Sequence, residues 1–262
     1  MGKEFTQEEE DMQFNRLTLA LVIGFLVVFS SLESSTALKL ASARADSGAG
    51  GTVSGLVKFE GQLPQPARIN MNADPTCAKA HSGAVTAEDY VAGTGGTLGN
   101  VIVFITDGLG DRTFEIPAEP VVVEQKGCVY LPHVLGVRAN QKLQVTNSDS
   151  TTHNIHPVPT NNREWNKAEP AGSTMEESFA REEVAIPVKC NVHPWMRGYI
   201  SVFKHPFFTI SGKDGHFDLR NLPPGEYTVE AWHEKLGTQK QKLVIASGEA
   251  KNIEFVFKVA GH

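Results

Sequence analysis

The sequence has few cysteines and lacks several spaced motifs of metal and cofactor proteins. It holds three cysteines in 262 residues and no Cys-x-x-Cys-His, so covalently attached haem c is excluded. It also has no His-x-His, which the trinuclear cluster of a multicopper oxidase needs, and no His-x-x-Glu of a zinc peptidase. Nor is there a surplus of basic residues. The formal net charge is −6, so we expect no broad phosphate-binding face and no nucleic-acid partner.

Long amphipathic helical runs are absent too, while 24 Gly and 14 Pro punctuate the chain. Short strand-like runs bounded by turn residues recur instead. They are Val53–Glu60, Asn100–Thr106, Val121–Glu124, Val129–Leu131, Lys142–Asn147, Val184–Val188 and Tyr199–Phe203. Strands at this spacing predict an all-β sandwich or barrel.

From residue 206 onward the pattern is that of a second, smaller β module. Phe207–Ser211 and His216–Leu219 flank the run Gly212–Gly215, whose Asp-Gly pair predicts a β-hairpin. Tyr227–His233 follows as a strand, and the last residues alternate apolar with polar as a half-buried strand does. The early strand Val53–Glu60 fits either module, and the sequence leaves that choice open.

Residues 1–45 are predicted to be a signal peptide or an N-terminal membrane anchor. Leu17–Leu32 is an uncharged, mostly apolar stretch of 16 residues after Arg16, shorter than the roughly 20 residues of a bilayer span. Small-x-small cleavage candidates follow at Ala41-Ser42-Ala43 and Ala43-Arg44-Ala45. In both cases we expect an exported protein, periplasmic or otherwise extracytoplasmic. Membrane association through this segment is the alternative to cleavage.

The odd number of cysteines indicates that one thiol has another task. In an oxidising compartment the simplest division is a Cys77–Cys128 disulfide, with Cys190 left for chemistry. Connectivity does not follow from sequence. A second metal site, built from Cys77 with His81 or from Cys128 with His133, is the alternative.

The segment from Cys190 to Met196 carries the chemistry. It places a thiol, an imidazole and a thioether, Cys190, His193 and Met196, at Cys-x2-His-x2-Met spacing. Soft sulfur ligands together with imidazole select copper over calcium or magnesium. A dinuclear copper centre would need a second cysteine in this loop, and a structural zinc site is usually a closed set of Cys and His. The loop therefore predicts a site for one copper ion.

A mononuclear blue-copper site needs one more imidazole from a distant segment. The strand ending at Asn147 leads through a polar turn into His153-Asn154. Here the chain resembles the cupredoxins, most closely amicyanin and plastocyanin, over roughly residues 120–204. The two-residue gap between His193 and Met196 is the amicyanin form.

The resemblance implies a role for each of these residues. His153 would be the first ligand, Cys190 and His193 the equatorial partners, and Met196 the weak axial ligand. Asn154 would tie the two ligand loops together, with its backbone near the Cys190 sulfur. His156 competes for the first position, but residues three apart on an extended chain point to opposite faces, and the resemblance favours His153.

The same resemblance implies an exported type 1 blue-copper protein that transfers single electrons and has no catalytic residues. Redox protein partners would dock where His193 reaches the surface, in an apolar patch formed by Val192, Pro194 and Trp195. The alternative is a non-redox copper-handling protein, or a β-sandwich binding module with a vestigial metal site.

The C-terminal stretch from Asp214 to Val229 resembles carboxypeptidase regulatory-like, or transthyretin-like, β-sandwich modules, a likeness of fold alone. The expected fold is thus all-β, a cupredoxin-type Greek-key β-sandwich plus a second small transthyretin-like β-sandwich. The expected ranges are 1–45 for the export segment, 46–99 for a linker and N-terminal β segment, 100–204 for the first sandwich and 205–262 for the second.

Overall fold

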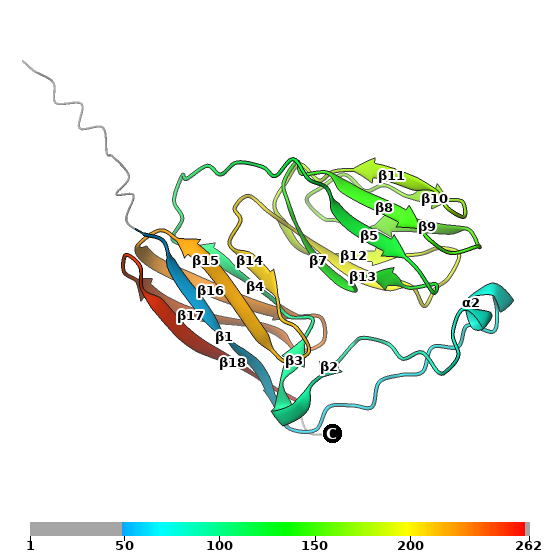
Figure 1. Cartoon of the computed structure of the whole chain (residues 1–262), viewed down its shortest axis with the longest axis horizontal. Helices are drawn as coiled ribbons and strands as arrows, with labels where there is room; N and C mark the ends of the chain where they lie inside the picture. Colours follow the sequence, from blue (N-terminus) through cyan, green and yellow to red (C-terminus); the bar gives the residue numbers. More distant parts are fainter. Residues whose placement is uncertain (1–48, 260–262) are drawn as a thin grey trace, which may run out of the picture. The chain divides into compact units, whose positions relative to one another are not determined.

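The computed structural model describes residues 49–259 (Figure 1). The chain divides into two units, Met1–Ala45 and Asp46–His262, and the described residues all belong to the second. The predicted signal or anchor segment Leu17–Leu32 lies outside the described residues. Within residues 49–259, no helix is long and apolar enough to cross a membrane.

Nearly all the regular secondary structure of the described residues is β-strand, which confirms the predicted all-β fold class. In the first sandwich one sheet has the strand order β10-β9-β12-β13-β7 and the other β11-β8-β5-β6 (Figure 1). Their bounds are β5 Val121–Gln125, β6 Tyr130–Leu131, β7 Val134–Arg138, β8 Leu143–Asn147, β9 His153–Pro157, β10 Lys167–Glu169, β11 Thr174–Glu177, β12 Glu183–Lys189 and β13 Arg197–Phe203. Neighbouring strands that are distant in sequence show that the chain crosses between the sheets, as in a Greek-key sandwich. Cys190 and Met196 belong to the apolar core between these sheets.

The second sandwich has a three-stranded sheet, β15-β1-β18, and a four-stranded sheet, β14-β4-β16-β17. The bounds are β1 Gly51–Glu60, β4 Ile102–Asp107, β14 Phe208–Ile210, β15 His216–Leu222, β16 Gly225–His233, β17 Gly237–Ile245 and β18 Ala250–Lys258. The predicted terminal alternation is present in β18, where Phe255 and Phe257 are buried beside Val53 and Val57 of β1. One apolar face of each strand therefore builds this core.

Strand pairing departs from the predicted boundary between the ranges 100–204 and 205–262. β4 pairs with β14 and β16, and β1 pairs with β15 and β18, so both belong to the second sandwich. The first sandwich begins only at β5. Val103 of β4 packs in the second core while Phe104 faces a separate apolar cluster, so the strand is buried on both faces. Such a continuous apolar run does not indicate which sheet it joins.

The hairpin predicted around Gly212–Gly215 is wrong. A turn is present, with the Gly215 N–H donating to the Gly212 carbonyl at 2.8 Å and Gly215 at φ +77°. The strands on either side pair elsewhere, β14 with β4 and β15 with β1. The turn therefore carries the chain from one sheet to the other, since its residues fix a reversal but not the partner strand.

Residues 61–98 form a mostly irregular strap between β1 and β4. It contains α2 (Pro75–Lys79), the short strands β2 (Val91–Ala92) and β3 (Leu98–Gly99), and the turn η1 (Thr94–Gly96). Cys77 of α2 is bonded to Cys128 with the two Cα atoms 5.6 Å apart, which confirms the predicted disulfide. The alternative metal sites with His81 and His133 are therefore excluded, because neither sulfur is available as a thiolate. Met71 and Cys77 are buried in the core of the first sandwich.

Candidate metal centre

The four predicted ligands come from two places in the first sandwich. His153 is the first residue of β9, and Cys190 follows β12 directly. His193 and Met196 lie on the short loop between Cys190 and β13. Two backbone bonds fold this loop: Met196 N donates to His193 O at 2.9 Å, and Cys190 N to Met196 O at 3.2 Å. All four side chains are buried, with none more than 3% exposed.

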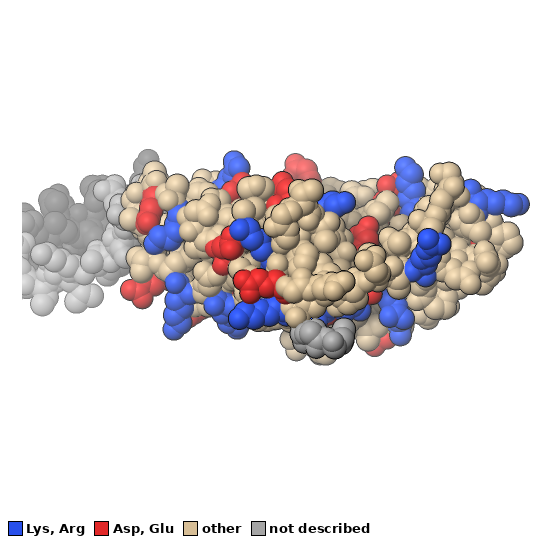
Figure 2. Space-filling model, turned by 90° about the horizontal axis from the view of Figure 1, so that it is seen from below, with Lys and Arg blue, Asp and Glu red and all other residues tan. Residues whose placement is uncertain are grey.

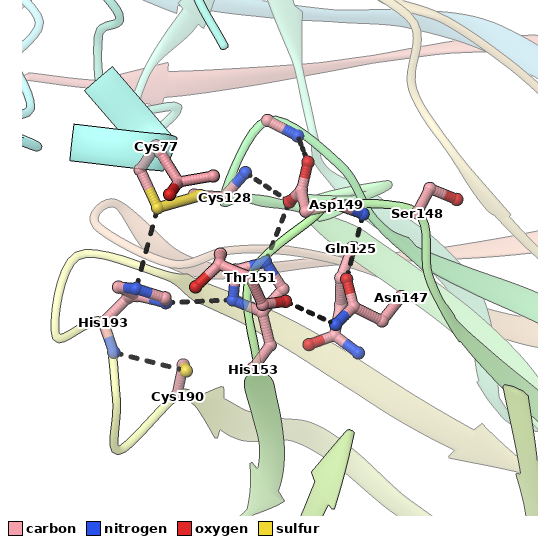
Figure 3. Close-up of polar contacts among 12 residues, drawn as sticks. Cys77, Gln125, Cys128, Asn147, Ser148, Asp149, Thr151, His153, Cys190 and His193 are labelled. Atoms are coloured by element: carbon pink, nitrogen blue, oxygen red, sulfur yellow. Dashed lines mark hydrogen bonds and ion pairs between the residues drawn. A yellow bond between two sulfur atoms is a disulfide. The ribbon is translucent and has the colours of Figure 1, made fainter. Parts of the chain in front are cut away.

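Three of the four side chains converge. One ligand atom each from His153, Cys190 and His193 lies within 4.8 Å of the other two. The Nδ1 atoms of the two imidazoles face each other at 2.9 Å (Figure 3). Met196 is fully buried in the same apolar core as Cys190. Its role as an axial ligand stays a prediction.

Each imidazole has a carboxylate on its other nitrogen. His193 Nε2 lies 3.0 Å from Asp74 Oδ2, and His153 Nε2 lies 2.8 Å from Asp149 Oδ2. The bond from His193 holds the pKa of Asp74 well below its usual range, even though burial acts the other way. Burial lowers the pKa of His153, partly offset by Asp149, and so favours the neutral ring that binds metals. Such outer carboxylates fix the tautomer and orientation of metal-binding histidines.

The hydrogen bonds to the two aspartates determine which ring nitrogens carry protons, and this leaves two lone pairs facing each other at the centre. An ionised carboxylate only accepts, so the Nε2 of each ring must donate to its aspartate. The Nδ1 atoms of His153 and His193 then both carry lone pairs, which point toward each other across 2.9 Å. Two lone pairs at this distance repel unless a proton or a metal cation lies between them. With the Cys190 sulfur beside them, the donor set fits copper, which prefers imidazole and thiolate.

Asn154 joins the two ligand segments, as expected, but through its side chain. Its Oδ1 accepts from the backbone N–H of Asn191 at 2.6 Å and of Val192 at 3.3 Å, and lies 3.3 Å from the Cys190 sulfur. Its Nδ2 donates to Asn166. The side-chain amide of Asn154 thus holds the Cys190 loop against β9, while the expected position of its backbone near the sulfur stays a prediction.

His156 is not part of the cluster. Its side chain is 13% exposed, and the ring bonds to Glu164 Oε1 at 2.6 Å and lies 3.2 Å from Asn191 Oδ1. His153, in contrast, is completely buried. The two rings therefore lie on opposite faces of β9, as the alternation along a strand predicts.

The expectation that His193 reaches the surface is wrong. The residue is only 2% exposed. Cys77 Sγ of the strap lies 3.6 Å from its Nε2 (Figure 3), the atom that also contacts Asp74 Oδ2. The half-buried Trp195 ring packs on the His193 ring with centroids 5.0 Å apart. Trp195 also lines a cavity of about 320 Å³. Val192 is 51% exposed, so the apolar surface near the centre lies beside His193 and not on it.

Sequence reasoning missed Asp74 and Asp149. Asp149 lies four residues before His153, in the polar turn that precedes it, so its position near the His153 ring could have been inferred from the sequence. Asp74 precedes Pro75 and caps α2, accepting from Thr76 N at 2.7 Å, and that capping is readable from the sequence. Its contact with a ring 119 positions away is not, because only the folded strap brings it there.

No family model matches this chain, and no curated protein sequence matches it. Among solved structures, a copper-containing nitrite reductase from Thermus scotoductus SA-01 aligns at 18% identity over 36% of this chain and 26% of that one, with a TM-score of 0.31. A purple cupredoxin from Nitrosopumilus maritimus aligns at 25% identity over 31% of this chain and 97% of that one, at 0.27.

An oxidised amicyanin variant aligns at 18% identity over 38% of this chain and 97% of that one, with a TM-score of 0.30. This chain therefore spans only about a quarter of the nitrite reductase but nearly all of the two small proteins. TM-scores of this size carry no conclusion about function, which must come from the residues of this chain.

Proposed function

We propose that this protein is an exported type 1 copper protein that transfers single electrons through one copper ion held by His153, Cys190, His193 and Met196. The observation that carries the proposal is the pair of Nδ1 atoms facing each other at 2.9 Å beside a buried thiol. The proposed role is that of an electron carrier and not of an enzyme.

Copper, when bound, supplies one-electron chemistry. The residues around the site supply rigidity and dryness. Asp74 and Asp149 hold the two rings from outside, and Asn154 holds the Cys190 loop. Because the four proposed ligands are buried, and the two imidazoles and the Cys190 loop are held by groups outside the site, little rearrangement accompanies the gain or loss of an electron.

Redox protein partners are proposed to dock beside His193, at Trp195 and Val192. Trp195 contacts the His193 ring and is itself half-buried, so it offers a route from that ring to the surface. On the face drawn in Figure 2, basic and acidic side chains are interspersed. We propose that docking depends on apolar contact at the ligand loop, where Val192 is exposed.

The second sandwich is proposed to be a carboxypeptidase regulatory-like module without chemistry of its own. The alternative function, a non-redox copper-handling protein, draws support from the covered His193. Buried ligands are expected both for an electron carrier that retains its copper ion and for a copper-handling protein that shields the ion from solvent.

The test is the visible and electron paramagnetic resonance spectrum of the protein loaded with Cu(II). We expect an intense visible band from thiolate-to-copper charge transfer. Cys190→Ser should abolish that band, because only a thiolate supplies it, while Asp214→Asn in the second sandwich should leave it intact. Copper binding without the band would favour the copper-handling alternative, and no copper binding at all would reject the site.

A further inference from the structure

The two carboxylates at the metal centre are themselves bound to the two halves of one disulfide. Asp74 Oδ1 accepts from the backbone N–H of Cys77 at 3.4 Å, and its Oδ2 contacts His193. Asp149 Oδ2 accepts from the backbone N–H of Cys128 at 2.7 Å and also contacts His153. Each aspartate therefore connects one imidazole to one half-cystine.

The Cys77–Cys128 bond closes this chain of contacts into a ring. It runs from His193 through Asp74 to the disulfide, and back through Asp149 to His153, whose Nδ1 faces that of His193 (Figure 3). Further bonds stiffen it. Asp149 Oδ1 accepts from Gly127 N at 2.7 Å, and Asp74 Oδ2 accepts from the Thr151 hydroxyl at 3.1 Å.

The strap half of this ring does not belong to either sheet. Asp74 and Cys77 lie on residues 61–98, whereas Cys128 and Asp149 lie on loops of the first sandwich. The strap has other anchors there: Met71 is buried in that core, and His81 Nε2 lies 2.7 Å from Gly127 O. The Cys77–Cys128 disulfide is the covalent anchor of the strap, and it lies next to the His193 ring.

We infer that Asp74 and Asp149 are positioning residues for the two imidazoles, and that the Cys77–Cys128 disulfide joins them into one brace that retains the metal. This inference rests on the proposed function and adds a thiol-dependent control to it. A dithiol reductant would give two electrons and two protons, becoming a disulfide itself while Cys77 and Cys128 become thiols. The strap could then lift Asp74 from His193 and open the centre.

The first arm of the test uses the metal-free protein, so that it does not depend on copper. Nitrogen-15 NMR of the histidine rings should show His153 and His193 both protonated at Nε2. Asp74→Asn should perturb the His193 ring and Asp149→Asn the His153 ring. Asparagine caps a helix as well as aspartate does, so Asp74→Asn preserves the cap on α2. It replaces the oxygen that faces His193 by an amide NH2, which carries no charge and cannot accept from the ring. Asp214→Asn is the matched control, since Asp214 accepts a turn N–H and its carboxylate contacts no imidazole ring.

The second arm measures Cu(I) affinity by chelator competition. Loss of an outer carboxylate typically weakens metal binding by about 10–100-fold. We expect this loss for Asp74→Asn and Asp149→Asn, and none for Asp214→Asn. Ring signals and affinity that stay unchanged in both aspartate variants would overturn the positioning role.

The third arm reduces the disulfide of the folded, metal-free protein with dithiothreitol, which is removed anaerobically before measurement. Both ring signals should shift and Cu(I) affinity should fall by at least as much as in either aspartate variant. Cys77→Ala/Cys128→Ala should reproduce this result, and reduction of the native protein serves if that variant does not fold. A reduced protein with unchanged rings and affinity would overturn the brace. If copper does not bind at all, the ring signals still decide, so the proposed function can fail separately.

Discussion

The two sandwiches differ in what they bury. Apart from His205, Ser211 and His233, the described core of the second sandwich is apolar, built around side chains such as Phe217, Phe255 and Phe257. The first buries a group of polar side chains around the imidazole pair: Gln125, Asn147, His153, Asn154, Glu169 and His193. A buried polar group costs stability unless it is hydrogen-bonded. The second sandwich therefore has a core organised for stability, whereas the first buries polar side chains, at a cost in stability, where the site is formed.

The polar group is connected by hydrogen bonds. Asn147 is completely buried; its Nδ2 donates to Glu169 O at 2.8 Å and to Thr151 O at 2.9 Å, and its Oδ1 accepts from Asp149 N at 3.0 Å. It thus shapes the turn that presents Asp149 to His153. Tyr130 donates its hydroxyl to the Asn154 carbonyl at 2.6 Å. Substitutions in this network should alter the site, whereas substitutions in the second core should alter only stability.

The largest effect should come from the apolar core. Phe255 is fully buried, and Phe255→Ala should lower the free energy of unfolding by about 3–5 kcal/mol, through lost burial and the cavity left behind. The absorption spectrum of the folded, copper-loaded variant should be that of the wild type. Denaturant unfolding measures the loss of stability, and visible absorption of the copper-loaded variant measures whether the site has changed. Val244→Ala, at an exposed position of β17, is the control, and an altered spectrum in Phe255→Ala would break the contrast between the sandwiches.

Glu169 gives a pH-dependent effect in the first sandwich. Burial raises its pKa to about 7, against the opposing bond from Gln125. The side chain oxygens Gln125 Oε1 and Glu169 Oε1 have no hydrogen-bond partner, and a protonated Glu169 could donate to Gln125. Because the folded-state pKa is raised, the folded protein holds this proton longer than the unfolded chain. Stability from this group therefore falls as pH rises from about 4.5 to 7.

Glu169→Gln keeps a neutral group and should remove that fall. The variant should gain roughly 3 kcal/mol on the wild type between pH 4.5 and 7.5, a difference of about 2.5 pKa units. Unfolding of the metal-free proteins by denaturant at a series of pH values measures this gain. Glu226→Gln, at an exposed site of the second sandwich, is the control. A gain that does not vary with pH would show that the pKa of Glu169 is the same in the folded protein and in the unfolded chain.

Met196→Leu should change the redox potential and little else. A weak axial ligand tunes the copper site without holding it together, so the visible band should remain. Leucine is of similar volume and keeps the buried position filled, which limits the loss of stability to less than about 1.5 kcal/mol. Voltammetry measures the change in redox potential, and the visible spectrum shows whether the band remains. Loss of the band would mean that Met196 is a primary ligand.

The smallest effect is expected at His156. His156→Ala removes a ring bonded to Glu164, so the spectrum should be nearly unchanged. His153→Ala, three residues earlier on β9, should abolish the band. The opposite pair of results would show that the first ligand had been assigned to the wrong face of β9.

The sequence was sufficient for the fold class and for three residues that meet at the centre, His153, Cys190 and His193. Short strand-like runs bounded by turn residues showed most strands, and the spacing of Cys190, His193 and Met196 placed these residues on one short loop. Membership of a sheet was harder, because turn residues such as Gly212–Gly215 fix a reversal but not a partner. β4 was assigned to the wrong sandwich for a different reason. The strand is buried on both faces, so its sequence lacks the alternation that would have shown which core it joins.

Apart from Asp149, the surroundings of the site could not be predicted from the sequence. The sequence placed His193 at the surface by resemblance, but the strap covers it with Asp74 and Cys77. That strap has no hydrophobic period, and its position follows from a disulfide and a capped helix of five residues. Long-range contacts of single polar atoms leave no pattern in a sequence.

Because β1 and β4 precede the first sandwich in the chain and β14 to β18 follow it, the first sandwich is an insert within the second. This has a consequence for the order of assembly during synthesis. β1 pairs with β18 from Thr52↔Ala250 to Glu60↔Lys258, so the first strand made must wait for the last. The first sandwich is complete at Phe203 and can fold while the rest is still being translated. A chain that stops before Ala250 would leave one edge of β1 without its partner, and unpaired strand edges promote aggregation.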